Sequence, residues 1–125
     1  VLARKPKAKS GGGKSTGYPD IEIILPSSIK HYIECKTFNI KNKSTSMRSF
    51  YVSPCENFKV THDAIHFIMG FEVFISGRQG SKNVYKTNGW KILDAYHLPC
   101  DVKYEFNSDN KRLYDSSMIL AEGTV

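Results

Sequence analysis

The sequence predicts an α/β fold in which a mixed central β-sheet is flanked by helices. Two observations support this prediction. Short runs rich in β-branched and aromatic residues alternate with turn signals along the chain, as is typical of strands. A longer stretch after residue 53 opens with a helix-capping pattern and carries apolar residues on one helical face. A chain of 125 residues is long enough for one compact domain with a modest core.

The first part of the chain is expected to form a loop and then a β-hairpin. Residues 1–17 are rich in Lys, Gly and Ser and predict a basic arm or loop. Residues 21–25 form an Ile-rich apolar run, which predicts a buried strand. A turn at residues 26–28 would bring residues 29–37 back as a second, antiparallel strand. Residues 50–52 predict a third, short strand.

The next stretch carries the signals of a helix. Ser53 can cap it, Pro54 suits the first helical position, and Glu56 can reach back to the amide of the cap. Apolar residues continue to residue 69, and Gly70 would supply the left-handed stop. A helix is therefore predicted between the third strand and a fourth strand.

The rest of the chain is expected to hold the fourth strand and a smaller appendix. Residues 71–76 predict the strand, and Asn88-Gly89 is a strong two-residue hairpin signal. We therefore divide the chain into an arm or loop at residues 1–17 and a domain at 18–125. Within the domain, residues 18–76 form the predicted core, and residues 77–125 form an appended hairpin and C-terminal segment.

Positive charge is concentrated in two segments. The net charge is +6, but residues 1–16 contain five basic residues and no acid, and residues 36–48 contain four and no acid. A polyanion brought to the stretch between them would meet both segments. The candidate phosphate contacts are Lys14, Lys41, Lys43 and Arg48. The alternative is a solvated tail and a solvated loop.

Three scattered cysteines, Cys35, Cys55 and Cys100, form no paired metal-binding motif. They predict buried free thiols in a reducing compartment, so we expect a cytoplasmic protein. No apolar run approaches the roughly 20 residues of a membrane helix, and we expect no membrane contact.

Gly13-Lys14-Ser15 looks like the end of a nucleotide-binding phosphate loop, but its surroundings do not fit. Such a loop needs an earlier glycine where Ala8 stands, an apolar strand before it and a helix after it. A basic segment comes before it, and Pro19 leads into a strand. We therefore expect no nucleotide role for Lys14 and Ser15.

A metal site is the better interpretation of the same region. Asp20 stands at the entrance of the first predicted strand, and Glu34 and Lys36 lie two residues apart on the second, so both point to one face. Pairing of the two strands would bring the two carboxylates and the ammonium together at one edge. Carboxylate oxygens are ligands for Mg²⁺.

Pro19-Asp20, the thirteen residues that follow, and Glu34-Cys35-Lys36 together resemble the signature of the PD-(D/E)XK nuclease superfamily. This superfamily includes type II restriction endonucleases, Holliday junction resolvases and repair nucleases. The resemblance covers roughly residues 17–76 and implies a restriction-endonuclease-like core. It implies that Asp20, Glu34 and the backbone carbonyl of Cys35 bind Mg²⁺, for which Mn²⁺ can substitute, and that Lys36 serves the attacking water.

The chain departs from the family pattern at its beginning. The family core opens with a helix and a strand that precede the Pro-Asp strand, and residues 1–16 contain neither a convincing helix nor an acid. We therefore expect the N-terminal part of the core to be incomplete in this chain. We also expect either a homodimer or a partner segment that completes the fold. Glu22, Glu56 and His31 are candidate additional site residues, while His62 and His66 are expected to be ordinary helix residues.

The resemblance implies a Mg²⁺-dependent endonuclease that hydrolyses phosphodiester bonds of double-stranded DNA, with a type II restriction enzyme as the leading expectation. A junction-resolving or repair nuclease is the alternative. A non-catalytic nucleic-acid-binding module, in which Glu34 and Lys36 form a surface pair, is the alternative of another class.

Overall fold

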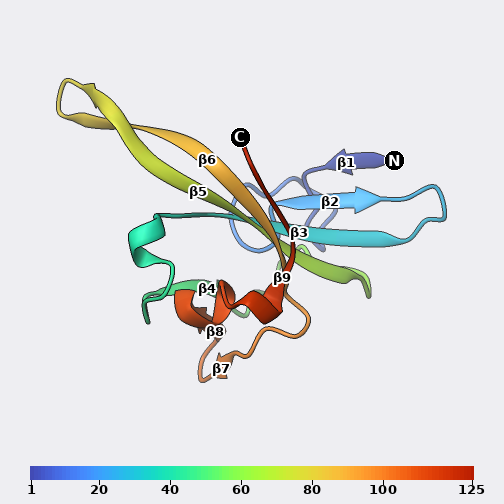
Figure 1. Cartoon of the computed structure of the whole chain (residues 1–125). Helices are drawn as coiled ribbons and strands as arrows, with labels where there is room; N and C mark the ends of the chain where they lie inside the picture. The colour runs from blue at the N-terminus through green and yellow to red at the C-terminus, as the bar shows by residue number, and fades with distance from the viewer.

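The computed structural model describes residues 1–125 and contains two β-sheets (Figure 1). The larger sheet has six strands in the order β1-β2-β3-β5-β6-β9. Their bounds are β1 Leu2–Arg4, β2 Ile21–Ile24, β3 Lys30–Phe38, β5 Ile65–Gln79, β6 Lys82–Asp94 and β9 Ile119–Thr124. The smaller sheet has the order β4-β8-β7, with β4 at Arg48–Val52, β8 at Phe106–Asp109 and β7 at Asp101–Val102.

The larger sheet is mixed, as predicted. β3 and β5 pair in parallel, and the other neighbours pair antiparallel. The predicted hairpin is also confirmed: β2 and β3 pair with Ile21 opposite Ile33 and Ile24 opposite Lys30. This register sets the position of Asp20 beside β3.

The hydrophobic core lies between the larger sheet, the smaller sheet and the short helix α1 at Asn110–Leu113. Its buried members are Phe38, Phe50, Ile68, Leu93, Leu98, Leu113 and Tyr114. The expectation that helices flank the sheet is wrong. Besides the four-residue α1, only the 3-10 turns η1 at Ile40–Asn42 and η2 at Ser116–Met118 are helical.

The predicted helix after residue 53 does not form. Residues 53–64 are a loop, and the apolar stretch from Ile65 onwards is the start of β5. Many of its residues are β-branched or aromatic and prefer strands. Gly70 is no helix stop: a Cβ there would lie 2.9 Å from Cε1 of Tyr114, so glycine allows the core to pack closely. Glu56 is exposed, and Ser53 donates from Oγ to Glu105 Oε2 at 2.7 Å instead of capping a helix.

The hairpin predicted at Asn88-Gly89 is also wrong. These residues lie inside β6, where Glu72 faces Gly89 and Val73 faces Thr87, so Asn88 is the extra residue of a bulge. The turn between β5 and β6 lies instead at Gly80, whose φ is +61°, a conformation that suits glycine.

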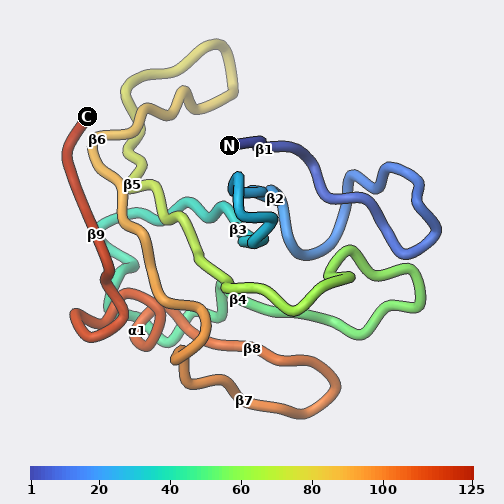
Figure 2. Tube along the Cα trace, turned by 90° about the vertical axis from the view of Figure 1, so that its right-hand side faces the viewer, coloured from blue at the N-terminus to red at the C-terminus, as the bar shows by residue number.

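The glycine-rich loop that follows β1 packs on the loop that precedes β5. The amide of Lys9 donates to the carbonyl of Phe58 at 2.8 Å, and the amide of Ser10 donates to Asn57 Oδ1 at 3.0 Å. Figure 2 shows both loops on the same side of the molecule. Both loops line the site described next.

Candidate functional site

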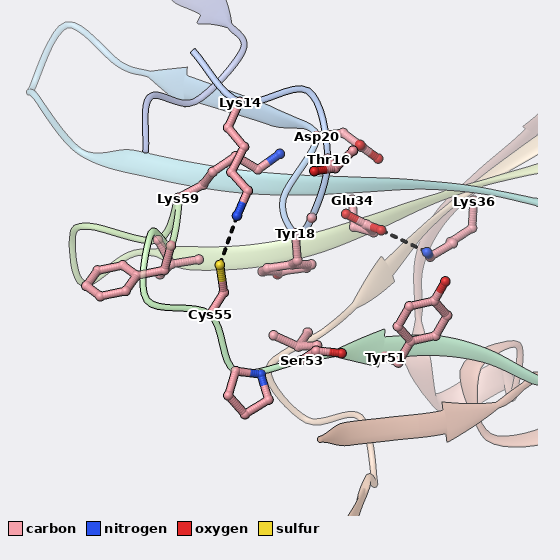
Figure 3. Close-up of a pocket in the computed structure, with 15 residues that line it drawn as sticks. Lys14, Thr16, Tyr18, Asp20, Glu34, Lys36, Tyr51, Ser53, Cys55 and Lys59 are labelled. Carbon is pink, nitrogen blue, oxygen red and sulfur yellow. Dashed lines mark hydrogen bonds and ion pairs between the residues drawn. The ribbon is translucent and has the colours of Figure 1, made fainter. Parts of the chain in front are cut away.

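A cavity of about 640 Å³ opens between the larger sheet and β4 (Figure 3). The glycine-rich loop contributes Lys14 and residues 16–18, and β3 contributes Glu34 and Lys36. β4 with the following loop contributes much of the opposite wall. Asp20, Glu34 and Lys36 all line this cavity. The structure therefore brings the two carboxylates and the ammonium together in one cavity, as the strand pairing predicts.

Asp20 is held at the edge of β3 by backbone contacts. Its amide donates to the carbonyl of Ile33 at 3.0 Å, and the amide of Cys35 donates to its Oδ2 at 2.8 Å. Its side chain is otherwise exposed and its Oδ1 accepts no hydrogen bond. The amide and carbonyl of one strand residue point to the same edge, so the carbonyl of Cys35 is directed to the edge where Asp20 lies.

Glu34 and Lys36 form an ion pair on the cavity face of β3. The distance from Lys36 Nζ to Glu34 Oε1 is 2.8 Å. Glu34 is 8% exposed, and its second oxygen, Oε2, is buried without a hydrogen-bond partner. The Lys36 ammonium also lies 5.3 Å from the centre of the Tyr51 ring. A buried carboxylate oxygen with no donor is costly unless a cation or donor reaches it.

The donor set suits a hard divalent cation. It offers the free oxygens of Asp20 and Glu34 and the carbonyl of Cys35. The structure contains no group of three His, Cys, Asp or Glu side chains able to hold a metal together. Mg²⁺ is commonly bound through one or two carboxylates while waters and substrate phosphate complete its shell, so two carboxylates are sufficient.

Lys59 is a cavity residue that no pattern in the sequence predicts. It is only 4% exposed, yet it forms no ion pair, and in Figure 3 it extends into the cavity toward Thr16 and Asp20. Burial lowers the pKa of its ammonium, while the charges of Asp20 and Glu34 act in the opposite direction. No local signal marked Lys59, because it lies in a loop whose position depends on contacts with the glycine-rich loop.

Tyr18 and His66 form a second unpredicted part of the site. Tyr18 lines the cavity, and its hydroxyl lies 2.6 Å from Nδ1 of His66. Burial, followed by the charge of Glu34, raises the pKa of Tyr18, so the hydroxyl keeps its proton and donates. Burial lowers the pKa of His66 and favours the neutral acceptor. His62 and His66 do not share a helix face: His66 lies on β5 and His62 in the preceding loop.

Lys14 lines the cavity through contacts with the opposite loop. Its Nζ donates to Cys55 Sγ at 2.9 Å and to the carbonyl of Asn57 at 3.1 Å. The prediction of a buried thiol is wrong for Cys55, which is exposed, and its hydrogen bond with Lys14 lowers its pKa. Cys35 and Cys100 are partly buried, and burial raises the pKa of both thiols.

Three other candidates lie outside the cavity. Glu22 is buried, and both of its oxygens are paired, Oε2 with Arg4 Nε at 2.8 Å and Oε1 with Lys30 Nζ at 2.9 Å. Glu56 is exposed and does not line the cavity. His31 stacks on Phe67 with ring centres 5.7 Å apart, on the face of the sheet opposite Glu34.

The predicted phosphate contacts after β3 lie in a segment that we call the basic loop, residues 39–48. Lys41 is exposed and Lys43 is half-buried. Arg48, at the start of β4, is exposed and pairs with Glu105, with Nη1 and Oε1 3.2 Å apart. None of the three lines the cavity. The loop begins directly after β3 ends, three residues beyond Lys36, which lines the cavity.

The fold and the cavity define a β-rich protein with a candidate site for a divalent cation and a phosphate. The sequence profile of the Type II restriction enzyme MjaV family matches residues 1–117, so the chain belongs to this family. The type II restriction enzyme MjaV of Methanocaldococcus jannaschii is 41% identical over 125 residues, which cover 94% of this chain and 52% of that protein. The chain thus spans about half the length of this relative. No solved structure matches the chain. No helix is long and apolar enough to span a membrane.

Proposed function

We propose that the chain carries the catalytic site of a Mg²⁺-dependent DNA endonuclease of the PD-(D/E)XK superfamily. The observation that supports this proposal most strongly is the convergence of Asp20, Glu34 and Lys36 in one cavity, with Glu34 Oε2 buried and unpaired. In this proposal Asp20, Glu34 and the carbonyl of Cys35 hold Mg²⁺ or Mn²⁺. The metal would supply neutralisation of the charge that develops on the scissile phosphate.

The side chains of the cavity have separate roles in this proposal. Lys36, tethered by Glu34 and lying beside Tyr51, orients the attacking water with its ammonium. Lys59 holds a non-bridging oxygen of the phosphate, since its side chain lines the cavity and its ammonium has no carboxylate partner of its own. Lys14 contributes positive charge at the rim.

The substrate we propose is double-stranded DNA, cut at a specific sequence. The support is membership in a family named for a type II restriction enzyme. Cutting both strands in one binding event would use two catalytic sites, and a homodimer or a partner segment would supply the second and complete the fold. A junction-resolving or repair nuclease is the alternative within the superfamily. We propose a cytoplasmic location, where DNA and reduced thiols coexist.

Plasmid cleavage tests the proposal. The wild-type chain in Mg²⁺ should cut supercoiled plasmid, and EDTA should stop the reaction. Asp20→Asn, Glu34→Gln and Lys36→Ala should each lower the rate by at least about 100-fold, as expected when charge stabilisation at the reacting phosphate is lost. Glu56→Gln, a matched change outside the cavity, should cleave like wild type.

The products separate the remaining alternatives. Discrete bands from linear DNA indicate a site-specific enzyme, while cleavage restricted to branched substrates indicates a resolvase. DNA binding without cleavage in Mg²⁺ or Mn²⁺ would contradict the nuclease proposal and favour a non-catalytic binding module.

A further inference from the structure

The strands β5 and β6 extend beyond the sheet as a two-stranded ribbon, which projects from the rest of the molecule in Figure 1. We call residues 74–88 the ribbon. Every residue in it is exposed, so no other part of the chain covers either face. Strand pairing nevertheless continues to its end, where Gln79 pairs with Lys82 across the turn at Gly80. At its base the carbonyl of Asn88 accepts a hydrogen bond from the amide of Val125 at 3.2 Å, and beyond this point the ribbon is a regular element that no other segment supports.

The charge of the ribbon has one sign. Arg78, Lys82 and Lys86 lie on it, and no acid occurs between Glu72 and Asp94. None of the ion pairs in the structure includes any of these three cations. Charge of one sign on a surface attracts partners of the opposite sign, so three uncompensated cations on one projecting element favour an anionic partner.

The end of the ribbon carries side chains able to recognise bases. Residues 78–83 contain Arg78, Gln79, Lys82 and Asn83, and the Nε of Arg78 donates to Oδ1 of Asn83 at 3.3 Å, which fixes both on one face. Arginine and lysine pair with guanine edges, and glutamine and asparagine with adenine edges, in the major groove of DNA.

We propose that this ribbon enters the major groove of the DNA substrate, where Lys82 and Lys86 bind phosphates and Arg78, Gln79 and Asn83 contact bases. The inference rests on the proposed endonuclease function, because it assigns a DNA contact to that same substrate. Two strands about 4.8 Å apart fit a groove about 12 Å wide. No part of the chain would have to move to free the ribbon.

The position of the ribbon relative to the cavity suits one continuous duplex. Lys36 faces Gly70 in the pairing of β3 with β5, so β5 runs from the cavity into the ribbon. At roughly 3.3 Å per residue, Phe74 lies about 13 Å and Gln79 about 30 Å beyond Gly70 along the strand. The second distance is close to one turn of DNA, about 34 Å, so a duplex cut at the cavity can present its groove to the end of the ribbon.

The distribution of apolar residues argues against a second copy of the chain as the occupant. Phe74 pairs with Lys86, and Ile75 pairs with Tyr85, so the apolar side chains are divided between opposite faces. Cations also lie on both faces. A protein interface would need one continuous apolar face at its centre, which the ribbon does not have.

Duplex binding by fluorescence anisotropy in metal-free buffer tests the proposal without requiring cleavage. Lys82→Ala/Lys86→Ala should weaken binding and reduce the slope of log affinity against log salt by about 0.9 for each phosphate contact removed. The matched control is Lys103→Ala/Lys111→Ala, which removes two exposed lysines outside the ribbon and should leave the slope unchanged. Circular dichroism confirms that both variants are folded.

Photocrosslinking to a duplex that contains 5-iodouracil places the contact, because the iodine replaces the thymine methyl group in the major groove. Crosslinked peptides should fall within residues 74–88. An unchanged salt slope together with crosslinks only elsewhere would overturn the proposal. The proposal would also be overturned if Lys82→Ala/Lys86→Ala kept its DNA affinity but differed from the wild type in the mass measured by sedimentation. That result would assign the ribbon to association between proteins.

Failure of this inference can be distinguished from failure of the proposed nuclease. Cleavage that depends on Glu34, combined with binding that does not depend on the ribbon, would overturn only the ribbon proposal. Ribbon-dependent binding without metal-dependent cleavage would overturn only the nuclease. A wild-type chain that binds no duplex would overturn both.

Discussion

Replacement of Lys59 with Met tests whether the cavity keeps a buried charge for function. Lys59 is 4% exposed, and burial lowers the pKa of its ammonium despite the nearby charges of Asp20 and Glu34. The charged form therefore costs folding free energy at neutral pH. Replacement of buried ion pairs or triads by apolar residues of similar volume can stabilise proteins by about 1–4 kcal/mol. We expect the lower end, about 1 kcal/mol, because Asp20 and Glu34 lose a neighbouring cation in Lys59→Met.

The pH dependence of this gain has a definite sign. Between the lowered pKa of Lys59 in the folded protein and the ordinary value of 10.5, the unfolded chain binds more protons than the folded chain. The stability of the wild type therefore rises with pH in this window relative to that of Lys59→Met. The advantage of the variant should be largest at neutral pH and should shrink at alkaline pH.

Thermal unfolding of the wild type and of Lys59→Met in EDTA, at neutral and at alkaline pH, measures this effect. A gain of about 1 kcal/mol corresponds to a rise in Tm of about 4 °C for a domain of this size. Lys111→Met, at an exposed site, is the control and should change stability by no more than about 0.5 kcal/mol. Plasmid cleavage by Lys59→Met should fall by about 100-fold. Stability that is lower than that of the wild type, or a difference that does not vary with pH, would refute the reasoning.

Three further predictions follow from local geometry. Cys55 should react with iodoacetamide faster than the other cysteines at neutral pH, and Lys14→Ala should slow it, since the Lys14 hydrogen bond lowers the pKa of the thiol; equal rates would contradict this. Gly70→Ala should cost roughly 1–3 kcal/mol in urea unfolding because its Cβ would meet Tyr114 at 2.9 Å, whereas Gly77→Ala, with nothing within 4 Å, should cost much less. Substitution of the three cations of the basic loop by Ala should lower the salt slope of DNA binding by about 0.9 per phosphate contact, and an unchanged slope would indicate a solvated loop.

The hairpin and the placement of Asp20, Glu34 and Lys36 in one cavity could be predicted because their signals are local. Apolar runs separated by a short turn define β2 and β3, and the two-residue period of a strand places Glu34 and Lys36 on one face. Pairing of Ile21 with Ile33 then brings Asp20 to the amide of Cys35. Each step depends on neighbours in sequence or on one hairpin.

The helix and the second hairpin were predicted wrongly because, in both stretches, the same sequence pattern fits two different structures. The apolar residues of β5 fit a helical face as well as a strand with both faces partly covered, and only the sheet pairing decides between them. Asn88-Gly89 is a turn signal in isolation, but here it accommodates a bulge and the close approach of Gly123, whose carbonyl would lie 3.1 Å from a Cβ at Gly89.

Lys59 and Tyr18 could not be found from the sequence because long-range contacts place them. The loop that carries Lys59 is fixed by the backbone bond between Lys9 and Phe58. Tyr18 is positioned by His66, 48 residues away in the chain. Neither contact leaves a local pattern, and a buried unpaired lysine is recognisable only when burial is known.

The central claim is that Asp20 and Glu34 hold one divalent metal ion, and titration with Mn²⁺ followed by electron paramagnetic resonance tests it most directly. The free-ion signal should show one ion bound per chain. Glu34→Gln removes half of the charge that the two carboxylates supply and should abolish this binding, while Glu56→Gln should keep it. A wild type that binds no Mn²⁺, or a Glu34→Gln variant that binds it as tightly as the wild type, would contradict the account.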